Sequence, residues 1–407
     1  MNMQSPNLTI SRRRLVAGAA LATVMPGLRV SLAADATKPR DILIVLFQRG
    51  ACDWLQMLSP AGDPAYIAAR PSIRIPTTGN NAGIGLGSMG TTDFYLPAVA
   101  TDLKTLYDAG DLAFVHATGI HTTERSHFTC QDMMEKGNAG AETKQRMGWL
   151  TRHIVSAGDG GHALSTMAVA ATNPSALLGD AGAIAIASAD NFNISGGTAN
   201  ANVIRALNTG TSPYRRVATA ALNAVTDVQA GLRAITDNSA AAGYTGGALS
   251  QSLRSLGKMI KMNVGVDIAT IDYGSWDMHN GLVGEFNTRT TEFSRAIGAF
   301  WKDMADYQNR ITLVTMTEFG RRVQENGSQG TDHGSGSGML VLGGNVNGGK
   351  IYGTWPGLGT AQLTTGDLTV TTDYRQVLSE ILVKRHAEKN LAGVFPTVKY
   401  APLGLTA

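Results

Sequence analysis

Asp41-Ile42-Leu43-Ile44-Val45-Leu46-Phe47 is an almost wholly apolar run near the start of the chain. A segment that is apolar at successive positions is typical of a strand buried on both faces of a mostly parallel sheet. Similar runs recur at residues 112–116, 167–171, 266–271, 311–317 and 339–342. We therefore predict a central sheet built from these segments.

Helical patterns separate the runs, at residues 96–109, 127–136, 287–308 and 374–386. Strands that alternate with helices predict an α/β sandwich, here over residues 38–400. The pattern changes over residues 188–263, where a loop rich in Gly, Asn, Ser and Thr precedes Ala-rich helical patterns at 214–235 and 249–262. This segment is interpreted either as a helical cap inserted into the sheet domain or as crossover helices with long loops.

The composition is that of a globular protein, since 43% of the 407 residues are hydrophobic and 16% are charged. The length suits one large α/β domain or two ordinary ones. The first 33 residues hold four of the 34 basic side chains and none of the 31 acidic ones, so the remainder has 30 basic and 31 acidic side chains, a net charge of −1. A near-neutral body without a basic patch predicts no nucleic-acid partner.

Residues 1–33 have the features of a twin-arginine signal peptide. Ser11-Arg12-Arg13-Arg14-Leu15-Val16 precedes an apolar stretch that ends at Met25, and Ser31-Leu32-Ala33 supplies small residues for cleavage before Ala34. About eleven apolar residues are fewer than the roughly 20 that a membrane-spanning helix needs, so we expect no membrane span. The mature protein would then be periplasmic or secreted. The alternative is an ordinary amphipathic N-terminal helix that contains three arginines.

The chain has two cysteines, Cys52 and Cys130. An oxidising compartment permits a disulfide between them, because each follows a motif expected at the same end of the sheet. Two buried free thiols are the alternative.

Polar side chains gather at or just after the ends of the predicted strands. In an open α/β sheet, ligands bind beyond the carboxyl ends of the strands. The candidate residues there are Gln48, Arg49 and Asp53 after the first strand; His116, His121, Arg125, Ser126 and His127 at the second; Asp277 and His279 after the strand at 266–271; and Glu318, Arg321, Asp332 and His333 after the strand at 311–317. Five of the eight histidines belong to this set, which predicts a single site.

Two pairs in this set have the spacing of metal ligands. Asp277 and His279 are two residues apart, so in extended chain they point to the same side and can reach one ion. Asp332-His333 forms the second pair, in a loop with glycines on both sides. Imidazole and carboxylate ligands suit Zn²⁺ or Mn²⁺. The alternative for each pair is a hydrogen-bonded loop feature.

Ser126 directly precedes the helix predicted at residues 127–136. A hydroxyl there faces the positive end of the helix dipole, which favours an attacking alkoxide, and Arg125 beside it would bind a phosphate or sulfate. The alternative is a structural N-cap.

The motifs together resemble a known family. They are Phe47-Gln48-Arg49-Gly50-Ala51-Cys52-Asp53, Gly62-Asp63-Pro64-Ala65-Tyr66, Arg125-Ser126-His127-Phe128, Trp276-Asp277-Met278-His279, Thr317-Glu318-Phe319-Gly320-Arg321-Arg322 and Gly330-Thr331-Asp332-His333-Gly334. Over residues 41–395 the chain resembles the exported bacterial family of domain of unknown function 1501. That family looks like a remote branch of the alkaline phosphatase, sulfatase and phosphoglycerate mutase superfamily.

The resemblance implies an alkaline-phosphatase-like, three-layer α/β/α sandwich with metal ions and a hydroxyl nucleophile at the strand ends. The superfamily's first strand usually ends in a metal-binding aspartate. Gln48 stands there in this chain, with Asp53 as a substitute, and Glu318-Phe319 keeps only the carboxylate of the superfamily's later Asp-His pair. These departures imply a single metal or a degenerate site.

Two functions follow. The first is an exported metal-dependent hydrolase or transferase that acts on a small phosphate or sulfate ester. Its residues would be Asp277, His279 and His333 as metal ligands; Glu318 and Asp332 as ligands or orienting groups; Ser126, with His127 beside it, as nucleophile; and Arg125 or Arg321 as the anion-binding group. The second is a non-catalytic protein that binds an envelope component on a degenerate alkaline-phosphatase-like fold. The missing first-strand aspartate favours the second, and the five histidines favour the first.

Overall fold

The structure is a computed structural model that describes residues 40–138, 145–158, 164–191, 197–210 and 213–407. The predicted signal peptide, residues 1–33, lies outside the described residues. Within the described part of the chain, no helix combines the length and the apolar character that a membrane span requires.

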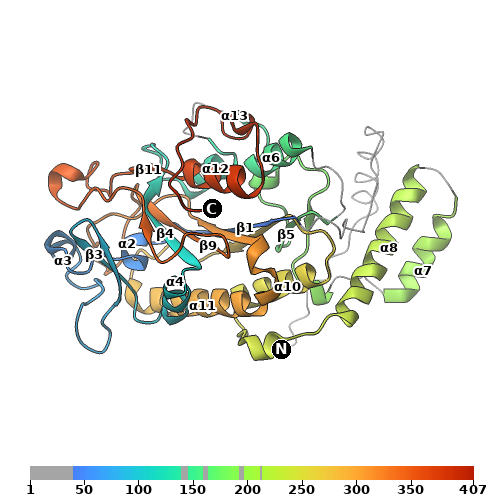
Figure 1. Ribbon diagram of the computed structural model, residues 1–407, viewed down its shortest axis with the longest axis horizontal. Coiled ribbons are helices and arrows are strands. Elements are labelled where there is room, and N and C mark those ends of the chain that lie inside the picture. Colours follow the sequence, from blue (N-terminus) through green and yellow to red (C-terminus); the bar gives the residue numbers. More distant parts are fainter. Residues whose placement is uncertain (1–39, 139–144, 159–163, 192–196, 211–212) are drawn as a thin grey trace.

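A nine-stranded sheet forms the centre of the molecule (Figure 1). The strands lie in the order β10-β4-β9-β8-β1-β7-β5-β6, and β11 pairs with β4. Their bounds are β1 Ile42–Gln48, β4 Leu112–Gly119, β5 Thr166–Ala168, β6 Ile184–Ala185, β7 Ile268–Tyr273, β8 Ile311–Met316, β9 Ser337–Gly343, β10 Ile351–Tyr352 and β11 Thr372–Asp373. Only β9 is antiparallel to its neighbours, β4 and β8. The prediction of an α/β fold with a mostly parallel sheet is confirmed.

Strand β1 shows why its apolar run requires a layer on each face. The even-numbered residues from Ile42 to Leu46 pack in one hydrophobic core, and the odd-numbered residues from Leu43 to Phe47 pack in another. Successive side chains of a strand point to opposite faces, so both faces of β1 are covered.

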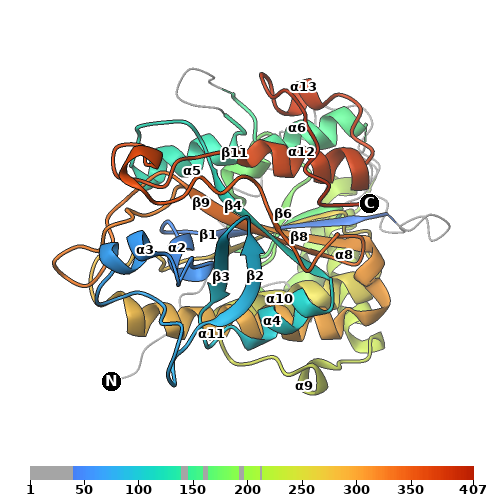
Figure 2. The ribbon, with the colours of Figure 1, turned by 60° about the vertical axis from the view of Figure 1, so that its left-hand side comes forward.

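Helices cover both faces of the sheet (Figures 1 and 2). The core that contains Ile42 also contains residues of α4 (Thr101–Asp108), α10 (Ala248–Lys261) and α11 (Leu282–Asp303). The core that contains Leu43 includes residues of α5 (His127–Glu135), α6 (Trp149–Ala157), α12 (Tyr374–Arg385) and α13 (Leu391–Val394). Short helices α2 (Trp54–Met57) and α3 (Pro64–Ala69) follow β1, and α9 (Ser239–Ala242) precedes α10.

A separate hairpin, β2 (Ile84–Met89) and β3 (Thr92–Leu96), was not predicted. Glycines inside and after β2 obscure its apolar pattern. The helix predicted from residue 96 begins instead at Thr101, because Leu96 ends β3 and Pro97 follows it.

The described parts of residues 188–263 do not form one cap. Helix α10 packs against α11 and β7, so this part of the segment belongs to a helical layer of the sandwich. Helices α7 (Gly197–Leu207) and α8 (Pro213–Ala234) form a hairpin at the end of the molecule away from α2 and α3 (Figure 1). The hairpin therefore does not cover the end of the sheet that α2 and α3 follow.

Candidate metal centre

Several of the predicted site residues come together at one edge of the sheet. His127 begins α5 after β4, Asp277 and His279 follow β7, and Glu318 follows β8. The carboxyl ends of these parallel strands lie on the same edge. His333 precedes β9, and because β9 is antiparallel, it enters the sheet from that edge.

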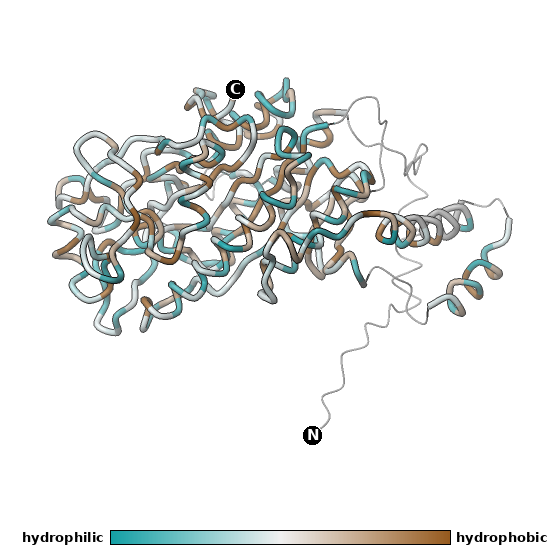
Figure 3. Tube along the Cα trace, turned by 60° about the horizontal axis from the view of Figure 1, so that its bottom comes forward, coloured by the Kyte–Doolittle hydropathy of each residue, from teal (hydrophilic) through white to brown (hydrophobic). Residues whose placement is uncertain are grey.

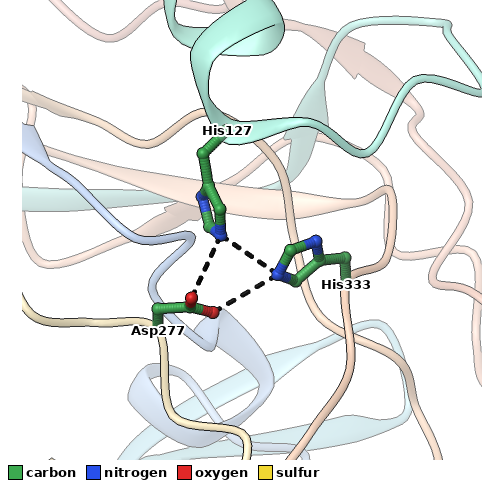
Figure 4. Close-up of side chains that lie close together, drawn as sticks. All are labelled: His127, Asp277 and His333. Atoms are coloured by element: carbon green, nitrogen blue, oxygen red, sulfur yellow. Dashed lines mark hydrogen bonds and ion pairs between the residues drawn. The ribbon is translucent and has the colours of Figure 1, made fainter.

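Three side chains form the centre of the site (Figure 4). One ligand atom from each of His127, Asp277 and His333 lies within 4.8 Å of the other two. Nε2 of His127 is 3.0 Å from Nε2 of His333 and 3.3 Å from Oδ2 of Asp277. Nε2 of His279 adjoins the trio, at 3.0 Å from Nε2 of His333 and 3.0 Å from Oδ1 of Asp277. We call these four residues the His–Asp cluster.

Each imidazole of the cluster has an acceptor on its other ring nitrogen. The three contacts are His127 Nδ1 with Oε1 of Glu318 at 2.7 Å, His279 Nδ1 with Oδ1 of Asp332 at 3.0 Å, and His333 Nδ1 with the carbonyl oxygen of Arg125 at 2.9 Å. An acceptor at Nδ1 keeps the proton there and leaves a lone pair on Nε2. All three Nε2 lone pairs are therefore available inside the cluster.

Glu318 lies behind His127 and not among the central three residues. Its fully buried carboxylate also accepts hydrogen bonds from the Gly50 amide at 2.8 Å and from Nε2 of Gln131 at 2.8 Å. Burial acts to raise the pKa of Glu318, but the bonds from His127 and Gln131 outweigh it and lower the pKa. The hydrogen bond between His127 and Glu318 raises the pKa of His127. Gln131 is not among the predicted site residues, although it lies one helical turn after His127 and shares its face.

Arg321 positions Asp277 and is not free to bind an anion. Its buried guanidinium donates to Oδ1 of Asp277 at 2.6 Å and to the carbonyl oxygens of Gly50, Ala51 and Thr331. Burial acts to raise the pKa of Asp277, but the hydrogen bond and charge of Arg321 outweigh it and lower the pKa to about 2. The structure thus replaces the predicted anion-binding role of Arg321 with a positioning role.

Arg125 and Ser126 have local structural partners. The Arg125 guanidinium donates to Asp367 at 2.8 Å and to the carbonyl oxygens of Thr122 and Glu124, so its contribution to the cluster is its own carbonyl group. Ser126 is the N-cap of α5, and its hydroxyl accepts from the Thr129 amide at 3.5 Å. The nucleophilic role of Ser126 stays a prediction.

The residues that end β1 do not join the cluster. Gln48 is buried and donates to the sulfur of Cys52 at 3.5 Å. Asp53 caps α2 and forms a buried ion pair with Arg70 at 2.9 Å. The structure therefore does not place Asp53 as the substitute metal ligand, because its charge is already compensated.

His116 and His121 lie outside the cluster. His116 belongs to β4 itself, where its Nε2 donates to the Leu58 carbonyl at 3.0 Å and its Nδ1 accepts from the Ala117 amide at 2.8 Å. Burial lowers the pKa of His116 to about 4, so it is a neutral core residue. His121 is exposed. The structure gathers three of the five predicted histidines.

Cys52 and Cys130 are buried free thiols, as the alternative to a disulfide predicts. Burial raises the pKa of the Cys130 thiol to about 12 and that of Cys52 well above its ordinary value. Neither thiol is a thiolate at neutral pH.

Comparison with known proteins gives one family match. The family model described as "Protein of unknown function (DUF1501)" matches residues 126–380. This range contains the whole His–Asp cluster, Glu318 and Asp332. No curated protein matches the chain.

Proposed function

We propose that this chain, which belongs to the family described as Protein of unknown function (DUF1501), is a metal-dependent hydrolase or transferase that acts on a phosphate or sulfate ester. The observation that carries the proposal is the set of three imidazole Nε2 atoms and one carboxylate in contact at the carboxyl edge of the sheet. His127, Asp277 and His333 would hold the ion, with His279 beside them.

The spacing of these atoms fits one shared ion. A tetrahedral zinc site with metal–ligand distances of about 2.0–2.1 Å places its ligand atoms roughly 3.3 Å apart. The contacts within the cluster are 3.0–3.3 Å. Two Nε2 lone pairs at 3.0 Å repel each other unless a cation or a proton lies between them, and one bound cation would accept both lone pairs.

Exposure favours a catalytic ion over a structural one. Structural zinc sites are closed by four protein ligands, whereas catalytic sites keep one position open. The Asp277 side chain is 44% exposed and the His279 side chain is 41% exposed, while Glu318 behind His127 is fully buried. The cluster is thus supported from the protein side and open toward solvent. Zn²⁺ or Mn²⁺ bound there would act as a Lewis acid on the ester.

Metal analysis and ester hydrolysis together test the proposal. We expect about one ion per chain in the wild-type protein and turnover of an aryl phosphate or aryl sulfate. Asp277→Asn should reduce metal occupancy and turnover at least tenfold while circular dichroism is unchanged. Asp108→Asn is the matched control, because Asp108 is an exposed carboxylate on α4 that pairs only with Lys104 among the residues described. Full occupancy and turnover in Asp277→Asn would contradict the proposal.

The role of Ser126 needs a separate test. An N-cap requires only an acceptor, so Ser126→Asp should keep the stability of α5, and Ser126→Gly should lose only a few tenths of a kcal/mol. Both variants should lose turnover by orders of magnitude if the hydroxyl attacks the ester. Retained turnover in Ser126→Gly would leave the serine a structural cap.

One observation favours a second function, a non-catalytic protein that binds an envelope component. The two arginines predicted to bind an anionic substrate, Arg125 and Arg321, both have their guanidinium groups engaged within the protein. A protein that holds one ion per chain and hydrolyses no ester in a broad panel would support this second function.

We further propose that the α/β fold is alkaline-phosphatase-like and that residues 1–33 direct export by the twin-arginine pathway to the periplasm or the medium. The helices on both faces of the mostly parallel sheet support the first statement. The arginine run and the small residues before Ala34 support the second.

A further inference from the structure

The α7–α8 hairpin projects from the body of the molecule and carries exposed aliphatic side chains that are not packed in a hydrophobic core. Helix α7 contains no buried residue. Val203 is 56% exposed and Leu207 is 72% exposed, and residues four apart lie on the same face of a helix. Helix α8 reaches back to the body through Val228, which is buried in the core. Figure 3 shows the hairpin set apart from the body, with hydrophobic positions along α7.

Every charge near the turn of the hairpin is positive. Residues 191–226 contain three arginines and no acidic residue, in a chain whose remainder beyond residue 33 is close to neutral. Arg205 and Arg215 are exposed, and Arg216 follows in the sequence. Gly210 lies in the connection between the helices, three residues after Leu207, and the Arg215 side chain from α8 lies beside it. An exposed leucine and two exposed arginines thus lie beside the turn.

We propose that the exposed side chains on either side of the α7–α8 turn, Val203, Arg205, Leu207 and Arg215, dock this chain on an anionic lipid bilayer. Leucine and valine side chains enter the headgroup region, and neighbouring arginines contact lipid phosphates, which is the pattern of interfacial helices. Residues 191–226 contain three arginines and no acidic residue, so the surface that complements them in charge is anionic. The hairpin lies at the end of the molecule away from α2 and α3 (Figure 1), so a docked protein keeps the His–Asp cluster away from the bilayer. This docking is independent of the proposed hydrolase activity.

Vesicle flotation of the full chain tests the proposal. The probes are vesicles of phosphatidylglycerol and phosphatidylethanolamine, compared with vesicles of phosphatidylcholine alone. We expect binding to the anionic vesicles at least tenfold stronger, and weakened by high salt. Arg205→Gln with Arg215→Gln should lower the affinity about fivefold for each arginine, and Val203→Ser with Leu207→Ser should lower it at least threefold. All variants keep the same N-terminus, so any vesicle binding by residues 1–39 is common to them.

Two substitutions outside the hairpin serve as matched controls. Arg295→Gln on α11 and Val155→Ser on α6 change an exposed cation and an exposed aliphatic residue elsewhere, and they should bind as the wild type does. Equal binding of the hairpin variants and the wild type, with unchanged circular dichroism, would overturn the proposal. So would self-association in the absence of vesicles that Leu207→Ser abolishes, because the exposed face would then bind a second copy of the chain.

Discussion

Replacing Glu318 by glutamine tests how the protein orients His127. Oε1 of Glu318 accepts hydrogen bonds from His127, Gly50 and Gln131 at 2.7–2.8 Å, and Oε2 accepts from the Thr317 hydroxyl at 3.2 Å. A glutamine can direct its oxygen to the same three donors and its amide nitrogen to the Thr317 oxygen. Glu318→Gln therefore keeps the shape and the main hydrogen bonds but removes the negative charge behind His127.

The loss should appear in metal affinity. Groups that orient a metal-binding histidine typically contribute 10- to 100-fold to affinity, which is about 1.4–2.7 kcal/mol. We expect Glu318→Gln to weaken Zn²⁺ binding within that range in a competition titration with a chromophoric chelator. Glu285→Gln is the control, because Glu285 is an exposed carboxylate in the first turn of α11.

Two results would refute this reasoning. An affinity unchanged within twofold, when His127→Ala abolishes binding, would show that the buried carboxylate does not support the imidazole. A loss as complete as that of His127→Ala would show that Glu318 is itself a ligand.

Three further predictions concern other parts of the chain. The pKa of His116 is about 4 in the folded protein and about 6.5 in the unfolded chain. Between these pH values the unfolded state binds more protons than the folded state. His116 therefore lowers the free energy of unfolding by up to about 1.4 kcal/mol per pH unit as the pH falls from 6.5 to 4. Urea unfolding at pH 6.5 and 5.0 with chelator present should show a smaller pH dependence in His116→Gln, and an equal dependence would contradict this assignment. Both cysteines should resist a thiol reagent in the native protein and react fully in urea without reductant; two unreactive sulfurs in urea would mean a disulfide. Arg12→Lys with Arg13→Lys should leave the precursor in the cytoplasm on fractionation, and unchanged export would exclude the twin-arginine pathway.

The sheet could be predicted because its strands are buried on both faces. Burial on two faces demands apolar side chains at successive positions, and β1, β8 and β9 are buried throughout. The β2–β3 hairpin lacks this signal, since one face of it is exposed and glycines interrupt it.

The candidate site was predictable only in part. The i, i+2 spacing of Asp277 and His279 brings both to His333, as extended chain allows. Adjacent residues in extended chain point to opposite sides, so Asp332 and His333 do not act as a pair, and Asp332 binds the far nitrogen of His279. The environment of Arg321 had no sequence signal, because backbone carbonyl groups around residues 50–51 supply its acceptors.

The members of the His–Asp cluster are spread along the chain from residue 127 to residue 333, with strands β5, β6, β7 and β8 between them in the sequence. A chain that has not yet paired β9 with β4 and β8 cannot bring His333 to His127, so it has no complete set of donors to offer a cation. Binding of the ion would then require that β9 has paired with β4 and β8. A ligand that binds only the folded state stabilises it by about 2.7 kcal/mol at a concentration 100 times its dissociation constant. The same ion would therefore also stabilise the folded chain against unfolding.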